Sequence, residues 1–429
     1  MRYHELETAP RSEIRALQDR RVREAVARAH DVAFYRRRLD DAGVSPGDVE
    51  SVDDLRSLPF TTKEDFRAEY PDGLFAAPRD ELRRIHASSG TTGKPKVVGY
   101  TAADLDRWVD LAARSLYAAG VRPGERVQNA AGYGLFTGGL GWHYGVERLG
   151  AGVVPAGAGN TRRQIELIAD LDADALVTLP SYALYLAEQA REAGRNPADL
   201  GLGSILVGAE PSTRETRATI GREYDATVTE NYGLSELLGP GMATECATAR
   251  DGMHLWEDHF YPEVIDPETG EVLGEGERGE LVLTALTREA LPLLRYRTGD
   301  VTAITYDPCE CGRTHARLDG ITGRTDDLLI VRGVNVYPTE VESVLGEFGD
   351  LAPHYRIDLH RRAGGLDEME VTVERGPDAD LGDTADLEER LTARLTEVLG
   401  LTPDEVTVVA HRALDRTEGK AKRVYDHRD

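Results

Sequence analysis

A short segment rich in glycine, hydroxyl and lysine side chains, Ser88-Ser89-Gly90-Thr91-Thr92-Gly93-Lys94-Pro95-Lys96, has the composition of a phosphate-binding loop. Glycines let backbone N–H groups approach a ligand closely, hydroxyls donate hydrogen bonds, and lysines supply positive charge. The segment is not a Walker A loop, because only Thr91 and Thr92 separate its glycines and Pro95 follows its first lysine. Taken alone, it fits a polyphosphate site or a flexible surface loop equally well.

A second group of reactive side chains is the tight turn Cys309-Glu310-Cys311-Gly312, which we combine with Cys246 and His254. Three thiolates and one imidazole satisfy the tetrahedral coordination of zinc, and clustered cysteines in a cytosolic chain favour metal over a disulfide. Four protein ligands leave no open position, so such a zinc site would be structural. His259 and His315 are rival fourth ligands, and free thiols are the alternative to a metal.

Composition limits the class of protein. The chain has 429 residues, more than one hydrophobic core usually holds, so two or three domains are expected. Its formal net charge of −25 argues against nucleic acid or an anionic membrane as a partner. No apolar run approaches the roughly 18 residues needed to cross a bilayer, and the charged N-terminus gives no sign of a signal peptide. Three cysteines, an odd number, favour a reducing cytoplasmic location.

The elements that must position these groups alternate along the first two thirds of the chain. Helical patterns lie at residues 11–45, 102–119, 162–169 and 181–193, and short apolar runs typical of strands lie at 126–130, 152–155, 175–179, 204–207 and 226–228. Such alternation predicts an α/β fold with a parallel sheet covered by helices. Gly- or Pro-containing turns follow several strands, at 132–134, 208–211 and 232–233, and ligands bind beyond the carboxyl ends of such strands.

The later part of the chain has a different pattern. Predicted strands at 261–265, 280–284 and 301–305 indicate a β-rich subdomain at about 250–325 within an N-terminal domain of residues 1–325. Residues 326–429 are predicted to form a small, mobile α+β domain with strands at 371–373 and 406–409. Its helix follows Thr384 and is stopped by Gly400.

Seven motifs occur in a fixed order. They are residues 88–96, Gly208-Ala209-Glu210-Pro211, Glu230-Asn231-Tyr232-Gly233-Leu234-Ser235-Glu236, Tyr296-Arg297-Thr298-Gly299-Asp300, Gly323-Arg324-Thr325-Asp326-Asp327, Arg332-Gly333-Val334-Asn335-Val336-Tyr337-Pro338, and Arg416-Thr417-Glu418-Gly419-Lys420-Ala421-Lys422. The series resembles the adenylate-forming superfamily of acyl-CoA synthetases and ligases. Further matches at 58–63, 133–140 and 256–260 make the phenylacetate-CoA ligase branch the closest likeness, over nearly the whole chain.

The resemblance implies an adenylate-forming enzyme fold and a two-step reaction. A carboxylate would attack the α-phosphate of ATP to form an acyl-adenylate, and a thiol would then displace AMP. Phosphoryl-type chemistry needs positioning and charge neutralisation more than covalent help from the protein. By this resemblance residues 88–96 would hold the β- and γ-phosphates.

The resemblance also implies individual roles. Glu236 would hold Mg²⁺ between phosphate oxygens, and Asp300 would accept hydrogen bonds from both ribose hydroxyls. A helix-start position for Glu236 and a turn cap for Asp300 are the alternatives. The other expected ATP or AMP contacts are Ser88, Ser89, Gly90, Thr91, Thr92, Gly93, Lys94, Gly208, Ala209, Glu210, Pro211, Asn231, Tyr232, Gly233 and Arg324.

The small domain would supply the catalytic lysine. Lys420 would reach the α-phosphate and the carboxylate and stabilise the charge that develops in adenylation, with Lys422 as its rival. Family members rotate this domain between the two half-reactions, and Asp326 is expected at the hinge, unless it caps a turn or helix. The thiol of CoA would enter past Arg332, Gly333 and Val334.

The acyl pocket is where the chain departs from its relatives. They carry tyrosine where this chain has Ala131 and alanine where it has Trp142, an exchange that conserves volume while it moves the cavity. Flat apolar walls from Tyr133, Phe136 and Trp142, with Pro240 nearby, favour an aromatic acid that need not be phenylacetate. A packed core position is the alternative for Trp142.

The sequence therefore predicts an ATP-dependent, Mg²⁺-dependent ligase that activates an aryl carboxylate and passes it to coenzyme A. A carrier-protein thiol supplied in trans or an amine is the alternative acceptor, and a non-catalytic nucleotide-binding relative is the alternative of another class. The identity of the acid is left open, as is whether the chain forms a homodimer.

Overall fold

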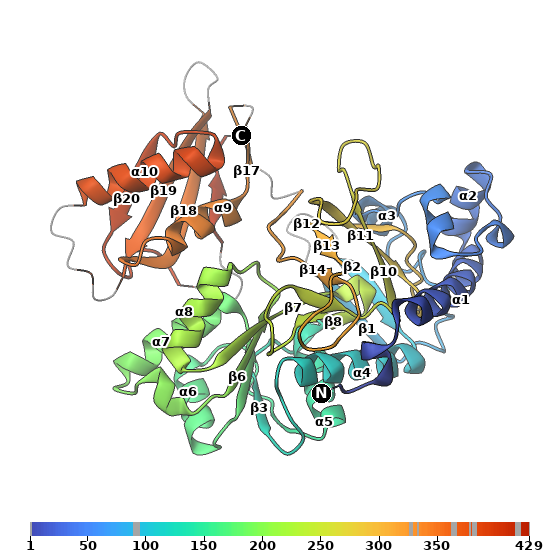
Figure 1. Cartoon of the computed structure of the whole chain (residues 1–429), viewed down its shortest axis with the longest axis horizontal. Helices are drawn as coiled ribbons and strands as arrows, with labels where there is room; N and C mark the ends of the chain where they lie inside the picture. Colours follow the sequence, from blue (N-terminus) through green and yellow to red (C-terminus); the bar gives the residue numbers. More distant parts are fainter. Residues whose placement is uncertain are drawn as a thin grey trace.

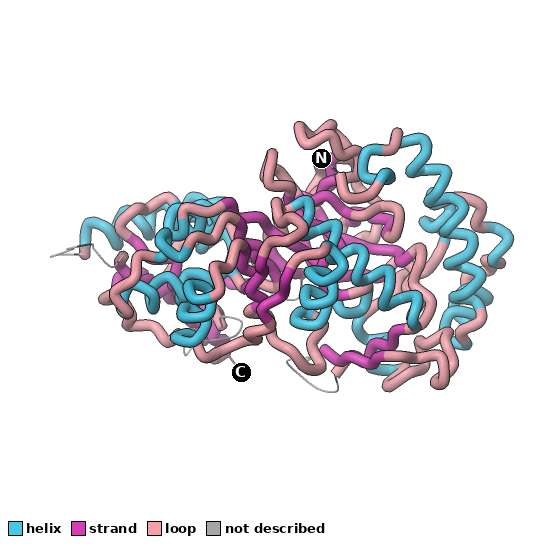
Figure 2. The backbone as a smooth tube through the Cα atoms, turned by 90° about the horizontal axis from the view of Figure 1, so that it is seen from below, coloured by secondary structure: helices cyan, strands magenta, loops and turns pink. Residues whose placement is uncertain are grey.

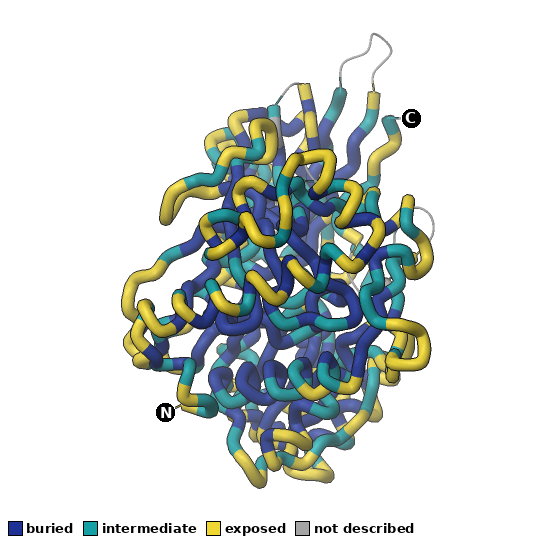
Figure 3. The backbone as a smooth tube through the Cα atoms, turned by 90° about the vertical axis from the view of Figure 1, so that its right-hand side faces the viewer, coloured by how far each residue is buried: buried dark blue, intermediate teal, exposed yellow. Residues whose placement is uncertain are grey.

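The computed structural model describes residues 2–88, 95–325, 329–332, 334–361, 367–376, 379, 384–416 and 422–428. A large N-terminal part carries a small C-terminal part at one end of the molecule's longest axis (Figure 1, Figure 2). Buried backbone runs through the interior of both parts, and exposed residues lie on outer loops and outward helix faces (Figure 3). No described helix has both the length and the apolar character that a membrane span requires.

A nine-stranded sheet with the order β13-β14-β9-β8-β7-β6-β5-β3-β4 organises the large part. Strands β3 to β7 pair in parallel, and β8, β9, β14 and β13 continue the sheet in antiparallel pairs. The strands are β3 (Arg126–Asn129), β4 (Gly152–Val154), β5 (Ala175–Thr178), β6 (Ser204–Gly208), β7 (Thr227–Leu234), β8 (Gly239–Glu245), β9 (Met253–Leu255), β13 (Ile304–Thr305) and β14 (Arg317–Leu318).

Helices cover both faces of the parallel strands. Successive strand residues point to opposite faces, so the apolar residues on each face pack against their own set of helices. Ala175 and Val177 of β5 share a core cluster with α4 and α5, whereas Leu176 shares one with α6, α7 and α8. These helices are α4 (Ala102–Ala118), α5 (Gly138–Leu149), α6 (Thr161–Asp170), α7 (Pro180–Glu192) and α8 (Arg214–Tyr224), with η4 (Pro197–Leu200) between α7 and β6.

The alternation predicted from the sequence is confirmed, with one local error. Predicted strands at 126–130, 152–155, 175–179 and 204–207 correspond to β3, β4, β5 and β6, and the predicted helices to α4, α6 and α7. Tyr232 and Gly233 do not form a turn, however, because β7 continues to Leu234 and pairs with β8 there. The turn comes later, at the short helix η5 (Ser235–Leu237).

A separate four-stranded sheet has the order β10-β11-β12-β15. The stretch predicted to be β-rich is therefore divided between two sheets, since β9, β13 and β14 belong to the nine-stranded one. The four strands are β10 (Phe260–Ile265), β11 (Gly279–Ala285), β12 (Tyr296–Thr302) and β15 (Gly323–Arg324).

The N-terminal segment packs into the same core cluster as this second sheet. The helical stretch predicted at 11–45 consists of two helices, which break at Asp31 and Val32. Its elements are η1 (Glu5–Thr8), α1 (Arg11–His30), α2 (Ala33–Asp41), η2 (Pro46–Asp48), η3 (Val52–Ser57), α3 (Lys63–Ala68) and the hairpin strands β1 (Arg84–Ser88) and β2 (Lys96–Tyr100).

The small C-terminal part has its own core cluster and a sheet of order β20-β19-β18-β21. Its predicted helix is confirmed as α10, which ends at left-handed Gly400 with φ of 64°. The elements are β16 (Leu329–Val331), β17 (Val334–Val336), α9 (Pro338–Gly346), β18 (Leu351–Arg361), β19 (Asp367–Arg375), α10 (Ala385–Leu399), β20 (Glu405–Val409) and β21 (Val424–Asp426).

Candidate active site

Segments that carry predicted site residues leave the nine-stranded sheet at one edge. β3, β6 and β7 are parallel strands of this sheet, so their carboxyl ends point to the same side. The loop to α5 follows β3, the loop to α8 follows β6, and η5 follows β7. The hairpin of β1 and β2 adds a further segment, in which Ser88 and Lys96 pair next to the connecting loop.

Glu236 on η5 is a buried carboxylate with two partners. Its Oε1 accepts a hydrogen bond from the Tyr296 hydroxyl at 3.0 Å and forms an ion pair with Lys96 Nζ. Burial acts to raise the pKa of Glu236, but the charge of Lys96 and the hydrogen bonds from Lys96 and Tyr296 together outweigh it, so the pKa lies below its ordinary value. Glu236 is therefore ionised at neutral pH beside Lys96, the first residue of β2.

Neighbouring segments fix the position of η5. The Tyr100 hydroxyl donates to the Ser235 carbonyl at 2.8 Å, and the Thr137 and Ser235 hydroxyls lie 2.9 Å apart. The contacts of Tyr296 and Tyr100 were not predicted from the sequence. A place for Tyr296 in the site could have been predicted, because it is the first residue of the motif that ends at Asp300.

Asp300 on β12 is the second buried carboxylate of the site. Its Oδ2 accepts a hydrogen bond from the Tyr232 hydroxyl at 2.6 Å, and Arg324 forms an ion pair with Oδ1. Arg324 reaches it because Asp300 and Arg324 are paired residues of β12 and β15. Tyr232, expected to contact ATP or AMP, donates this hydrogen bond to the carboxylate that was expected to bind ribose.

The segment after β6 runs close to β7. A Cβ on Gly208 would lie 2.5 Å from the Asn231 carbonyl oxygen, so only glycine fits there, and Ala209 adopts the left-handed region with φ of 66°. The Glu210 carboxylate accepts a hydrogen bond from the Ser181 hydroxyl at 2.7 Å. Pro211 follows it at the surface.

Asn231 and Gly233, which were predicted to contact the nucleotide, stabilise the pairing of β7 with β8 in this structure. The Asn231 side chain donates to the Ala243 carbonyl at 2.9 Å and accepts from the Gly241 N–H at 3.4 Å. A Cβ on Gly233 would lie 2.2 Å from the Gly239 carbonyl oxygen. Both residues therefore hold the strand that carries Tyr232 toward the site.

Several predicted residues lie outside the described residues: Ser89, Gly90, Thr91, Thr92, Gly93, Lys94, Asp326, Gly333 and Lys420. Their roles stay predictions. The rival Lys422 is described, and its ammonium lies 4.3 Å from the centroid of the Tyr425 ring. Arg332 donates to the Thr402 carbonyl at 2.6 Å, within the small part, and Val334 begins β17.

The chain is similar to known proteins over nearly its whole length. A family model described as AMP-binding enzyme matches residues 17–285, and one described as AMP-binding enzyme C-terminal domain matches residues 333–428. The phenylacetate-coenzyme A ligase of Thermus thermophilus is 50% identical over 441 residues, covering 99% of this chain and 99% of that relative. Its counterpart in Escherichia coli K12 is 46% identical over 432 residues, covering 99% and 97%. The chain belongs to the AMP-binding enzyme family. Within this adenylate-forming superfamily it lies in the phenylacetate-CoA ligase branch.

A solved member of the superfamily also matches the arrangement of the two parts. The 2-hydroxyisobutyryl-CoA ligase in its postadenylation state is 32% identical, with a TM-score of 0.91 over 98% of this chain and 91% of that one. The same ligase in its thioesterification state gives a TM-score of only 0.73 over 99% and 91%. Since coverage hardly changes, the arrangement described here resembles the postadenylation state.

In this AMP-binding enzyme the loop after β3 exposes aromatic side chains. Tyr133 is 37% exposed and Phe136 43% exposed. The Tyr133 hydroxyl accepts a hydrogen bond from the Asn129 amide at 2.9 Å and lies 3.1 Å from His143 Nδ1. The Phe136 ring packs against Gly138, where a Cβ would come within 2.5 Å of it.

Of the other predicted pocket residues, Trp142 is buried, whereas Ala131 and Pro240 are half-buried. Trp142 is 5% exposed and belongs to the core cluster between α4, α5 and the sheet, and Ala131 packs against that cluster. Trp142 thus occupies the packed core position that was the alternative to a place in the pocket. The Pro240 carbonyl accepts a hydrogen bond from the Trp108 indole at 3.1 Å, and a Cβ on Gly141 would lie 2.8 Å from the Pro240 ring.

A buried ion cluster beneath the β6 loop was not predicted. Arg217 donates to Glu230 at 2.9 Å and to Glu245 at 3.2 Å. Burial raises the pKa of Glu230 to about 7, although the charge of Arg217 acts against it. No sequence pattern connects α8 to these strands, because the three residues meet only through the fold.

The small part contacts the large part through Glu188 on α7. His354 Nε2 lies 3.4 Å from Glu188 Oε1, Arg416 3.3 Å from Oε1, and Arg412 3.4 Å from Oε2. Burial acts to raise the pKa of Glu188, but the neighbouring His354 imidazole and the charge of Arg416 lower it to about 2. Thr216 on α8 adds a hydrogen bond of 2.7 Å to Glu342 on α9.

The three thiols and His254 cluster in the nine-stranded sheet, beside β8, β9 and the turn between β13 and β14. Cys246, His254, Cys309 and Cys311 each place one ligand atom within 4.8 Å of the others. The rival histidines have other partners. His315 accepts from the Glu257 N–H at 2.9 Å, and His259 lies 2.8 Å from the Thr287 hydroxyl.

Proposed function

We propose that this protein activates an aryl carboxylate with ATP, through an acyl-adenylate, and transfers the acyl group to coenzyme A. The observation that carries the proposal is the ion pair between Lys96 and the buried, ionised Glu236. Lys96, the last residue of the predicted phosphate loop, thus lies beside a carboxylate suited to a divalent cation, which supports the proposal. The 46–50% identity to phenylacetate-CoA ligases supports the substrate classes.

The first half-reaction joins the acid to AMP. A carboxylate oxygen attacks the α-phosphorus of ATP, the bond from that phosphorus to the bridging oxygen breaks, and pyrophosphate leaves. Asp300, oriented by Tyr232 and Arg324, would hold the ribose. Lys420 would neutralise charge on the α-phosphate and the carboxylate in the transition state.

The second half-reaction forms the thioester. The thiol of CoA gives its proton to water, its sulfur attacks the acyl carbon, and the bond from that carbon to the AMP oxygen breaks, so AMP leaves. We assign the thiol path to Arg332, Gly333 and Val334 and the hinge to Asp326. A carrier protein in trans and a homodimer stay predictions, which product analysis and light scattering would test.

Magnesium fits the chemistry of the site. An ionised carboxylate together with phosphate oxygens is an ordinary Mg²⁺ environment, and Glu236 is ionised and buried beside Lys96. Bound there, Mg²⁺ would neutralise the charge of the departing pyrophosphate. Lys96 holds the same carboxylate oxygen now, so it would move toward the phosphates when the ion binds.

An aromatic acid fits the loop after β3. Tyr133 and Phe136 expose flat rings there, and the Tyr133 hydroxyl is held by Asn129, which leaves the ring face available for stacking. Because Trp142 lies in the core, the ring contacts would come from these two residues. The Tyr133 hydroxyl also offers a polar contact for a ring substituent.

Acid-dependent ATP–pyrophosphate exchange tests the function. With a panel of phenylacetates and benzoates and without CoA, exchange should depend on the acid, and adding CoA should yield the thioester. Glu236→Gln should lower the exchange rate by about 10²–10³-fold, the usual cost of losing one preorganised charged group. Glu271→Gln, at an exposed turn position, is the matched control and should leave the rate unchanged. Failure of exchange with every acid would contradict the proposal, and exchange without thioester would point to another acceptor.

A further inference from the structure

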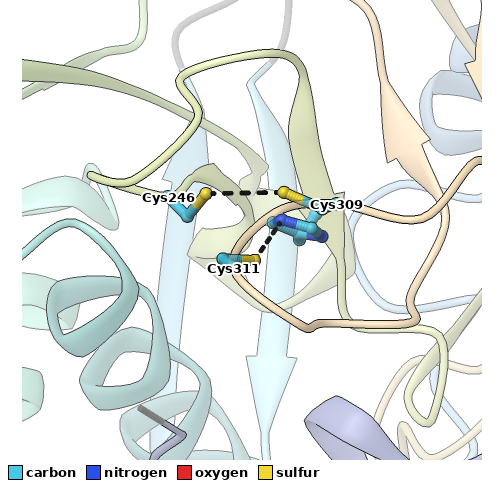
Figure 4. A group of neighbouring side chains, drawn as sticks. Cys246, Cys309 and Cys311 are labelled. Atoms are coloured by element: carbon cyan, nitrogen blue, oxygen red, sulfur yellow. Dashed lines mark hydrogen bonds between the residues drawn. The ribbon is translucent and has the colours of Figure 1, made fainter.

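The three cysteines of the chain are brought together at one place. Cys246 follows β8, His254 lies in β9, and Cys309 and Cys311 lie in the turn between β13 and β14. These segments are up to 65 residues apart in sequence, and the pairing of β14 with β9 brings them side by side. Figure 4 shows the three sulfur atoms pointing toward a common centre. All three thiols of the chain therefore face one another and one imidazole.

The distances match the edges of a tetrahedron around a metal. The sulfurs of Cys246 and Cys309 are 3.8 Å apart, and the Cys311 sulfur lies 3.3 Å from His254 Nε2. A tetrahedral zinc ion with bonds of about 2.3 Å to sulfur and about 2.0 Å to nitrogen gives edges of about 3.8 Å and about 3.5 Å. The side chains thus need only small shifts to coordinate an ion.

The surroundings of the cluster suit thiolate ligands. Cys246 and His254 are buried, at 1% and 0% exposure. The Ala249 N–H donates to the Cys246 sulfur at 3.4 Å, a contact that stabilises a thiolate. Gly312, with φ of 83° and its N–H on the Cys309 carbonyl, closes the turn that aims both thiols inward.

We propose that these four residues bind one zinc ion and that the ion is structural. Thiolate-rich, tetrahedral sites of three cysteines and one histidine select zinc, and four protein ligands leave no position for a substrate. A disulfide would use two of the thiols and leave the third thiol and the buried imidazole without a function. The site lies outside the residues assigned to adenylation, so its occupancy and the proposed function can fail independently.

The ion would fasten the N-terminal segment as well as the turn. The residues after Cys311 hold that segment: Arg313 donates to Glu7 at 2.8 Å, and the Thr314 hydroxyl donates to the Ala9 carbonyl at 2.6 Å. Anchoring the turn to β8 and β9 therefore also anchors residues 7–9. If His254 binds the ion through Nε2, its Nδ1–H is buried and has no hydrogen-bond partner among the described residues. The free energy lost by leaving this N–H unpaired is small compared with the free energy of structural zinc binding.

Metal analysis of the whole wild-type chain tests the site directly. After expression with added zinc and gel filtration in metal-free buffer, elemental analysis should find one zinc ion per chain. Titration with an organomercurial should then consume three thiols while releasing that ion to a chromogenic chelator. A zinc content well below one per chain, another metal in its place, or a single reactive thiol after denaturation would overturn the proposal.

Variants identify the ligands. Cys309→Ser and His254→Gln should each lose most of the bound zinc, whereas His315→Gln, which alters the rival imidazole next to the turn, should keep it. Cobalt substitution gives a second readout that does not depend on variants, because a tetrahedral thiolate site produces intense visible bands and charge-transfer absorption. Full zinc content in Cys309→Ser, or cobalt spectra of an octahedral site, would overturn the proposal.

Discussion

Lys420 is the residue for which the sequence makes the sharpest functional claim. Its ammonium is expected to act only in adenylation, so Lys420→Ala should lower acid-dependent pyrophosphate exchange by about 10²–10³-fold. Thioester formation from supplied acyl-AMP should stay near the wild-type rate. The matched control is Lys422→Ala, whose ammonium lies over the Tyr425 ring and should be dispensable for exchange. Equal loss of both half-reactions in Lys420→Ala would contradict the assigned role.

Tyr232 provides a second test at the level of one atom. Its hydroxyl donates to Asp300 at 2.6 Å, so Tyr232→Phe removes a hydrogen bond to a charged group and keeps the ring. Such a bond contributes about 1.5–3 kcal/mol, so KM for ATP should rise by roughly tenfold to a hundredfold. KM for the acid should change little, because the contact orients the carboxylate that we propose binds ribose. Steady-state kinetics with each substrate varied in turn would show the difference, and equal changes in both KM values would contradict it.

At the scale of elements, the pairing of β7 with β8 controls where Glu236 lies. Gly233 has no room for a Cβ, since the Gly239 carbonyl oxygen would be 2.2 Å away. Gly233→Ala should push the strands apart, lower the free energy of unfolding by about 1–3 kcal/mol and reduce pyrophosphate exchange through displacement of η5. Gly47→Ala is the control, because nothing lies within 4 Å of a Cβ there. Urea unfolding and the exchange assay measure the two effects, and wild-type stability in Gly233→Ala would contradict the argument.

Prediction of the elements succeeded where periodicity was local and failed where pairing was not. α4 and α10 carry complete helical patterns with Thr101 and Gly400 at their ends, and both were predicted closely. The end of β7 was placed too early because Gly233 resembles a turn residue. In the structure this glycine is required because β8, a separate segment of the chain, approaches its backbone closely.

For the whole molecule, Glu188 controls how the two parts are held together. Its carboxylate faces His354, Arg412 and Arg416 of the small part. Glu188→Gln should weaken this arrangement by about 1 kcal/mol, or roughly fivefold, as for a partly exposed ion pair. Because the arrangement resembles a postadenylation state, adenylation should slow while thioester formation from acyl-AMP does not. Glu223→Gln, whose partner Arg191 lies within the large part, is the control. Slowing of both half-reactions would contradict the prediction.

The same contact should weaken in mild acid. Burial holds the pKa of His354 below its ordinary value of 6.5, although Glu188 beside it acts in the opposite direction and Arg416 and Arg423 reinforce the lowering. Below pH 6.5 the separated parts therefore bind more protons than the docked ones, so docking weakens as the pH falls. The contribution of Glu188, with its pKa lowered from 4.5 to about 2, is lost only below pH 4.5. Fluorescence energy transfer between dyes on the two parts should report separation as the pH falls from 7.5 to 5.5, and His354→Gln should abolish that dependence.

The sequence by itself determined the family, the order of the motifs and the chemistry of the reactive groups, because these depend on residue types and short spacings. Only the tertiary structure decided which groups meet. It paired Glu236 with Lys96 and Asp300 with Tyr232, and it placed Trp142 in the core. It also brought His254, and neither rival histidine, to the three thiols. Each of these outcomes depends on strands and helices that are distant in sequence packing side by side, and no local pattern in the chain encodes that contact.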